Sequence, residues 1–220
     1  ARKDKLLSSD HFTVDGTLIE AWASFKSFKR KDDDEPPKPG DGTGMVDFKG
    51  EKRSNATHRS TTDPDAKLMR KGNGQPAKLS YGGHALMENR SGLCVDLLIT
   101  DATLAEHQAA RQLLTRARRR RIHPKTLGAD KGYHVKDFVQ HLREHNIRPH
   151  IARIEGRKTP GLDGRTTRTE GYKISQRKRK RIEEIFGWLK TVGGMRKTRF
   201  IGEARTQIAA YLSAAAYNLL

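Results

Sequence analysis

Residues 176–190 read Gln-Arg-Lys-Arg-Lys-Arg-Ile-Glu-Glu-Ile-Phe-Gly-Trp-Leu-Lys, a stretch that joins dense positive charge, apolar residues and two acids. At about 100° per residue in an α-helix, four of its apolar residues fall within about 60° of Ile182 and so form one stripe for burial. These residues are Ile182, Ile185, Phe186 and Leu189. The stretch therefore predicts an amphipathic helix that packs on a sheet or on another helix.

Two adjacent glutamates of this helix point in different directions. With Ile182 at 0°, Glu183 falls at about 100°, on a flank of the apolar stripe, whereas Glu184 falls at about 200°, towards solvent. Arg179 and Lys190 fall at about 60° and about 80°, on the same flank as Glu183. Glu183 can therefore lean over the edge of a packed sheet, and it is the better candidate for a metal ligand.

The chain of 220 residues is strongly basic, with 44 Lys and Arg against 26 Asp and Glu and a net charge of +18. Such a charge attracts polyanions, so nucleic acid is the expected partner. A solvated basic surface, as in many ribosome-associated proteins, is the alternative. Cys94 is the only cysteine, which excludes an internal disulfide and a cysteine metal site. Because the sequence has no apolar run of membrane-spanning length and no signal-peptide segment, a cytoplasmic location is expected.

The remaining periodicities predict strands and helices in an alternating order. Strands are expected near residues 11–24, 77–88, 93–100, 125–129 and 148–152, and helices near 102–121, 135–146, 175–191 and 203–220. A hairpin followed by alternating strands and helices indicates an α/β fold with a mixed sheet flanked by helices. At this length, a single domain over residues 1–220 is expected.

Two segments lack periodicity and are expected to be flexible loops. The first spans residues 27–62 and includes the charged, proline-rich run at 31–40, which cannot bury a core. The second spans residues 155–171 and is rich in Gly, Thr and Arg.

Two aspartates lie where predicted strands could present ligands. Asp15 falls within the first strand, on the opposite side from Phe12 and Val14, although aspartate is disfavoured in strands. An Asp-Gly hairpin turn is the alternative reading of this position. Asp130 follows the apolar strand at 125–129, and ligands of α/β sheets bind at the carboxyl ends of strands. Capping of the next helix is the alternative for Asp130.

Three carboxylates on three separate elements can hold divalent metal ions. Mg²⁺ and Mn²⁺ prefer oxygen ligands, and two such ions about 3.5–4 Å apart can activate an attacking oxygen and stabilise a leaving oxygen in phosphoryl transfer. No other site competes, because the histidines show no zinc spacing with partner cysteines and the sequence has neither a P-loop nor a GxSxG motif. The acidic trio in a basic chain suggests metal-assisted cutting of a nucleic-acid backbone.

At these residues the sequence resembles bacterial insertion-sequence transposases of the DDE type, which have a ribonuclease H-like fold. Val14-Asp15-Gly16-Thr17 resembles the strand with the first Asp, and Gly128-Ala129-Asp130-Lys131-Gly132-Tyr133 resembles the segment with the second. The third segment resembles a signature of Tyr, two residues, Arg, three residues, Glu, six residues and Lys. Arg179, Glu183 and Lys190 keep this spacing, whereas Gln176 stands where the signature has Tyr. The resemblance covers nearly all of the chain.

The resemblance implies the chemistry of the site and the roles of its residues. Asp15, Asp130 and Glu183 are implied to bind two Mg²⁺ or Mn²⁺ ions. Water would attack the phosphodiester at the end of the element, and the freed 3′-hydroxyl would then attack target DNA. Arg179 and Lys190 are implied to contact the DNA backbone. Charge alone makes four more residues either phosphate contacts or solvated charges: Arg177, Lys178, Lys180 and Arg181.

The resemblance also implies a partner, a location and a missing region. DNA, as element ends and as target, is the implied partner, with a homodimer on paired ends and a bacterial, nucleoid-associated location. Members of the group carry a helical DNA-binding region upstream of the first Asp. Only fourteen residues precede Asp15, so that region is expected to be absent.

Three other functions stay open at this point. An inactive DNA-binding remnant or domesticated protein would keep the fold without the chemistry. Another nuclease of the same fold would cleave Holliday junctions or RNA–DNA hybrids without joining strands. A basic structural protein of a ribonucleoprotein would tolerate alanine at Asp15, Asp130 and Glu183 without any change in activity.

Overall fold

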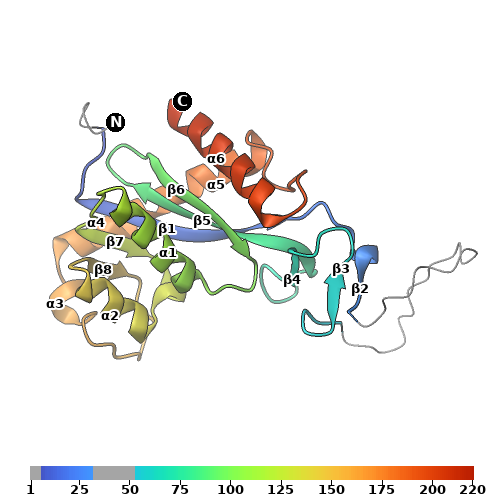
Figure 1. Cartoon of the computed structure of the whole chain (residues 1–220). Coiled ribbons are helices and arrows are strands. Elements are labelled where there is room, and N and C mark those ends of the chain that lie inside the picture. Colours follow the sequence, from blue (N-terminus) through green and yellow to red (C-terminus); the bar gives the residue numbers. More distant parts are fainter. Residues whose placement is uncertain (1–5, 32–52) are drawn as a thin grey trace, which may run out of the picture.

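Six strands form the central sheet of the computed structural model, which describes residues 6–31 and 53–220 (Figure 1). The strands are β1 (His11–Glu20), β4 (Lys67–Met69), β5 (Lys78–Glu88), β6 (Cys94–Asp101), β7 (Thr126–Ala129) and β8 (Arg148–Ile151). β5 pairs antiparallel with β1 on one edge and with β6 and β4 on the other, whereas β1, β7 and β8 are parallel neighbours. This is the mixed sheet of a ribonuclease H-like fold, so the predicted α/β class is confirmed.

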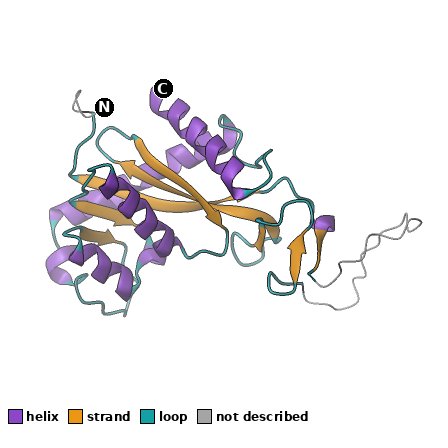
Figure 2. Cartoon of the chain, in the orientation of Figure 1, coloured by secondary structure: helices purple, strands orange, loops and turns teal. Residues whose placement is uncertain are grey.

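Helices cover both faces of this sheet (Figures 1 and 2). α1 (Glu106–Arg119) and α2 (Lys136–Glu144) lie on one face, and α4 (Glu170–Lys178), α5 (Ile182–Thr191) and α6 (Glu203–Leu219) lie on the other. The period of two along β1 explains this division. Phe12 and Val14 belong to the core under α1 and α2, whereas Ile19 belongs to the core under α5 and α6. No helix in the described part of the chain is both long enough and apolar enough to cross a membrane.

The prediction of a flexible loop over residues 27–62 is wrong at both ends of that segment. β2 (Phe28–Arg30) and β3 (His58–Ser60) pair antiparallel as a separate two-stranded sheet. The Phe28 ring stacks on the His58 ring with 5.4 Å between centroids. Strands of three residues that depend on so distant a contact leave no periodicity in the sequence. The proline-rich part of this segment lies outside the described residues.

The prediction of a flexible loop over residues 155–171 is also wrong in part, because α3 (Gly164–Thr167) and the start of α4 lie within it. Side-chain caps explain both helix starts. The Asp163 carboxylate accepts a hydrogen bond from the N–H of Arg165 at 3.0 Å, and the Thr169 hydroxyl accepts one from the N–H of Tyr172 at 3.2 Å. Such caps depend on polar residues, which hydrophobic periodicity does not detect.

The predicted helix over residues 175–191 is not one continuous α-helix. A 3₁₀ turn, η3 (Arg179–Arg181), separates α4 from α5. The apolar stripe of α5 is nevertheless buried as predicted, because its four residues all lie after this turn. Trp188 packs edge-on against Tyr217 of α6 with 5.9 Å between ring centroids.

Burial of His150 on β8 makes the stability of the fold depend on pH. The side chain is 3% exposed, and neither ring nitrogen has a hydrogen-bond partner in the described structure. Burial, followed by the charges of His11 and Arg148, lowers the pKa of His150 from 6.5 to about 4. The folded chain therefore holds this ring neutral while the unfolded chain takes up a proton, so stability falls as pH drops from about 6.5 towards about 4.

A His150→Leu variant should lose this dependence. We expect its free energy of unfolding, relative to wild type, to rise by about 1–2 kcal/mol between about pH 7.5 and about pH 5. Urea unfolding at the two pH values measures the difference, and His123→Leu, at an exposed position, is the control. Parallel pH profiles for wild type and His150→Leu would contradict the assignment.

Candidate active site

The pairing register of β1 with β7 brings Asp15 and Asp130 together. Thr13 of β1 pairs with Gly128 of β7 in the parallel ladder. Asp15 and Asp130 each lie two residues further along, so their side chains share one face of neighbouring strands about 4.8 Å apart. Asp15 lies in the interior of β1, which excludes the hairpin-turn reading of Asp15-Gly16.

Each of the two carboxylates is oriented by the N–H of a nearby glycine. Asp15 Oδ1 accepts a hydrogen bond from Gly16 N at 2.8 Å, and Asp130 Oδ1 accepts one from Gly132 N at 2.8 Å. Asp130 thus caps a 3₁₀ turn, η2 (Lys131–Tyr133), in place of the helix that begins at Lys136. Capping engages one oxygen of a carboxylate, so the capping and metal-binding readings of Asp130 are compatible.

Glu183 approaches the two aspartates from α5. Its negative charge contributes to the raised pKa of Asp15, which is about 6. Burial is the largest cause of that shift; the Gly16 N–H and the charge of Arg179 oppose it, and Asp130 and Glu183 add to it. Glu184 turns away and lies 3.8 Å from Arg181 as an ion pair. The structure therefore brings Asp15, Asp130 and Glu183 together and leaves Glu184 outside the group.

Glu106, in the first turn of α1, is a fourth carboxylate of this group that the sequence analysis missed. Burial of its carboxyl group, followed by the charges of Asp130 and Asp15, raises its pKa to about 7, although the residue as a whole is exposed. The predicted helix begins at residue 102, whereas α1 begins at Glu106, so the sequence did not mark Glu106 as a residue at a helix start. The signal that could have identified Glu106 is its position as an acid at the first residue of the helix that follows the β5–β6 hairpin.

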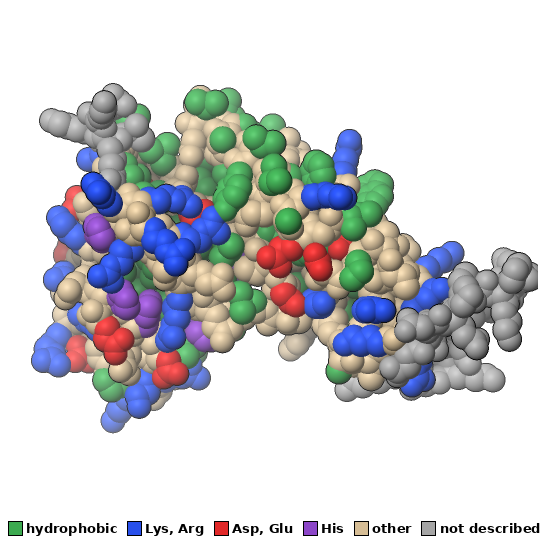
Figure 3. All heavy atoms as spheres, viewed as in Figure 1, with side chains coloured by type: hydrophobic (Ala, Val, Ile, Leu, Met, Phe, Trp, Pro, Cys, Tyr) green, Lys and Arg blue, Asp and Glu red, His purple; other side chains and the backbone are tan. Residues whose placement is uncertain are grey.

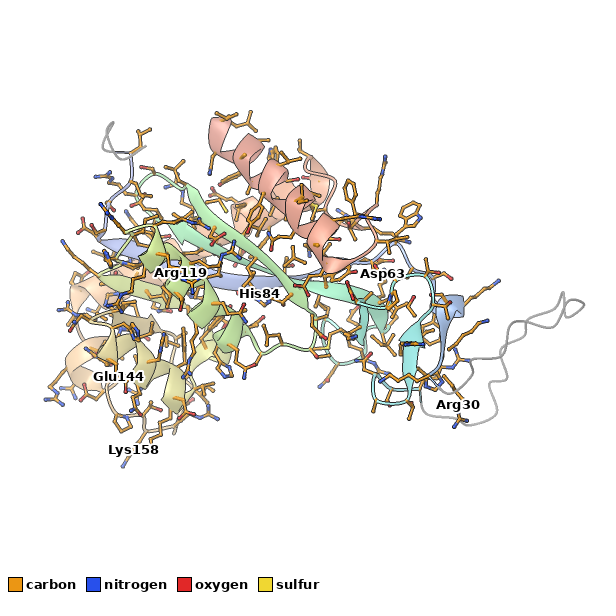
Figure 4. All side chains as sticks on the ribbon, viewed as in Figure 1. Arg30, Asp63, His84, Arg119, Glu144 and Lys158 are labelled. Carbon is orange, nitrogen blue, oxygen red and sulfur yellow. The ribbon has the colours of Figure 1, made fainter. Side chains whose placement is uncertain are left out.

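The arrangement fits a divalent cation. The pKa values of Asp15 and Glu106 are raised by burial and by the charges of neighbouring carboxylates, a repulsion that a positive charge between them would relieve, and Mg²⁺ and Mn²⁺ take oxygen ligands. Two buried polar atoms beside the group also have no hydrogen-bond partner in the described structure: the Tyr133 hydroxyl oxygen and His84 Nδ1. His84 lies on β5 in the middle of the sheet (Figure 4). Together with Gly16 and Glu106 it lines a cavity of ≈ 390 Å³.

Arg179 is held beside the carboxylates by Gln176, the residue that replaces the signature Tyr. Gln176 Nε2 donates a hydrogen bond to the backbone oxygen of His150 on β8, and Gln176 Oε1 accepts one from Arg179 Nε at 3.2 Å. The positive charge of Arg179 lowers the pKa of Asp15. Gln176 thus connects β8 to the Arg179 guanidinium group, whose charge acts on Asp15, a role that sequence spacing alone could not show.

Lys190 also lies on this side of the sheet. Its Nζ donates a hydrogen bond to Thr17 Oγ1 at 2.6 Å, two residues along β1 from Asp15. Burial, followed by the charges of Lys71 and Arg196, lowers the pKa of Lys190. The amine is therefore positioned by the strand that carries Asp15.

The other four basic residues of the predicted DNA-binding set lie on a different surface. They line a shallow hollow of ≈ 420 Å³ together with Asn89 and Glu184: Arg177, Lys178, Lys180 and Arg181. Arg181 Nη1 donates to the backbone oxygen of Asn89 at 3.3 Å. The six predicted contacts thus divide into Arg179 beside the acidic group, Lys190 further along β1 and four residues on a neighbouring surface. Lys and Arg side chains also gather over α1 and α2 and beside β2 and β3 (Figure 3).

Fold and site together define a class, the ribonuclease H-like proteins with an acidic centre beside the first strand. The sequence identifies the family: the chain belongs to the transposase DDE domain family, whose model matches residues 37–219. The matched range includes Asp130 and Glu183 and begins after Asp15. Transposases of this family use divalent metal ions.

Other comparisons add little to this assignment. No curated protein sequence matches the chain. One solved structure that the chain is similar to is the cryo-EM structure of a piggyBac transposase synaptic complex with hairpin DNA. It has a TM-score of 0.48 and 8% sequence identity, and the match covers 96% of this chain. The chain spans 46% of the length of that protein.

Replacement of Gln176 tests whether this residue acts through Arg179. We expect Gln176→Leu to lower the rate of metal-dependent DNA nicking about tenfold or more, because the released Arg179 guanidinium would no longer be held near Asp15. In an Arg179→Leu background the same change should have little further effect. Plasmid nicking rates of the two single variants and the double variant give the coupling. Additive losses in the double variant would contradict a role of Gln176 through Arg179.

Proposed function

We propose that the chain is the catalytic domain of a transposase that cuts DNA at the ends of an insertion sequence and joins the freed 3′ ends to target DNA. The observation that carries the proposal is the convergence of Asp15, Asp130 and Glu183 from β1, the end of β7 and α5. Membership of the transposase DDE domain family supports the same reaction.

Asp15, Asp130 and Glu183 would hold two Mg²⁺ or Mn²⁺ ions. When bound, such a pair supplies activation of the attacking oxygen and stabilisation of the leaving oxygen in an in-line displacement. The carboxylates suit this role because they are oxygen ligands, and the Gly16 and Gly132 N–H groups already orient two of them.

Arg179 and Lys190 would bind the DNA backbone next to the reacting phosphate. Arg179 lies close enough to Asp15 to lower its pKa, and its guanidinium can contact two phosphate oxygens at once. Lys190, fixed on Thr17, would place a point charge further along β1. The net charge of +18 would draw DNA to this surface from a distance.

The hollow formed by Arg177, Lys178, Lys180 and Arg181 would bind DNA away from the cleaved bond. Its basic side chains are mostly exposed, so each phosphate contact would add affinity without sequence preference. A homodimer on paired ends, a single domain over residues 1–220 and a nucleoid-associated location stay predictions from the resemblance and the composition.

Nicking of supercoiled plasmid tests the proposal. We expect wild-type protein to nick the plasmid when Mn²⁺ is present and not in EDTA. Glu183→Gln should abolish nicking, because it removes a ligand charge while keeping the shape of the side chain. Glu184→Gln, on the adjacent residue, is the matched control and should nick like wild type.

Other outcomes would favour other functions. Equal nicking by all three proteins would contradict a role for Glu183. DNA binding by all three without nicking by any would favour a catalytically inactive, DNA-binding protein. Cleavage of RNA–DNA hybrid or Holliday-junction substrates without strand joining would favour another nuclease of this fold.

A further inference from the structure

Two glycines flank the acidic group, and backbone conformation does not account for them. Gly16 lies in the interior of β1 and Gly132 follows Asp130 in η2. Neither is among the glycines with positive φ, so a residue with a side chain could adopt either backbone conformation. A glycine inside a strand weakens it and often marks a place where another group approaches closely. The group that approaches both glycines is the carboxylate of Glu106.

The room at both glycines is occupied by the two oxygens of this carboxylate. A Cβ atom at Gly16 would lie 3.0 Å from Glu106 Oε1 and 3.0 Å from His84 Nδ1. A Cβ atom at Gly132 would lie 3.3 Å from Glu106 Oε2 and 3.1 Å from Asp130 Oδ1. The Glu106 carboxylate therefore lies between the strand that carries Asp15 and the turn that follows Asp130.

We infer that Glu106 is a fourth metal-binding carboxylate of the active site, and that Gly16 and Gly132 leave the space in which its carboxylate reaches the ions. This inference rests on the proposed metal-dependent function and deepens it. An acid in the first turn of a helix is also favoured by the helix dipole. That preference would explain why position 106 is an acid. It would not explain why glycines stand at the two positions that its carboxylate oxygens approach.

Charge and geometry both favour a fourth carboxylate. Asp15, Asp130 and Glu183 supply three negative charges, and Glu106 makes four, which equals the charge of two divalent cations. α1 and α5 lie on opposite faces of the sheet. Glu106 therefore approaches Gly16 and Gly132 from the face opposite to Glu183, and the acids surround the site from both sides.

Calorimetric titration of Mn²⁺ into the protein tests the inference without any need for catalysis. We expect Glu106→Gln to bind one ion fewer or to bind Mn²⁺ about tenfold or more weakly, because affinity follows the number of charged ligands. Glu184→Gln, on an exposed residue of α5 that is ion-paired with Arg181, is the matched control and should titrate like wild type. The melting temperature in EDTA shows that each variant is folded.

Changing the glycine tests the same contact without removing a carboxylate. Gly16→Ala should weaken Mn²⁺ binding, because the added methyl group displaces Glu106 Oε1. In a Glu106→Gln background, Gly16→Ala should reduce the affinity for Mn²⁺ much less, because the displaced side chain no longer binds an ion. An equal loss of Mn²⁺ affinity in both backgrounds would overturn the role of Gly16 in leaving space for the Glu106 carboxylate.

Asp15→Asn separates failure of this inference from failure of the proposed function. If Asp15→Asn loses Mn²⁺ and Glu106→Gln binds it like wild type, Glu106 is not a ligand while the proposed site stands. If Asp15→Asn also binds Mn²⁺ like wild type, the proposed site itself is wrong, and the role of Glu106 fails with it.

Discussion

The parallel pairing of β1 with β7, which extends over only His11–Thr13 and Thr126–Gly128, is the constraint on which the site depends. It ends two residues before Asp15 and two residues before Asp130, so both aspartates lie where the strands cease to pair. β1 continues as a partner of β5, whereas β7 turns into η2. The two carboxylates thus stay side by side, and Glu183 and Glu106 can reach them from opposite faces.

Bringing four acids together opposes folding of the metal-free chain. Desolvation is the largest cause of the raised pKa values of Asp15 and Glu106, and neighbouring acids add to both. The apolar cores on the two faces of the sheet offset this cost, with Phe12 and Val14 on one side and Ile185 on the other, all at most 1% exposed. A cation bound between the carboxylates would relieve this repulsion. Cation binding should therefore be favourable and should stabilise the folded chain.

The sequence predicted most of the sheet and the placement of three acids, because both depend on local patterns. Alternation in β1 and the apolar stripe of α5 are short-range signals, and they place Asp15 and Glu183 correctly relative to the core. Long-range contacts could not be predicted. The pairing of β2 with β3, for example, depends on the stacking of the Phe28 ring on the His58 ring. Glu106 was missed because its importance comes from Gly16 and Gly132, which are distant in sequence. The role of Gln176 likewise depends on the backbone of His150.

The most direct measurement is anomalous X-ray scattering from crystals grown with Mn²⁺. We expect scattering peaks between Asp15 and Asp130, with Glu183 and Glu106 as the ligands from the two flanking helices. A peak bound by Glu184, or Mn²⁺ ions located only on other surfaces while these four carboxylates stay free of metal, would contradict it.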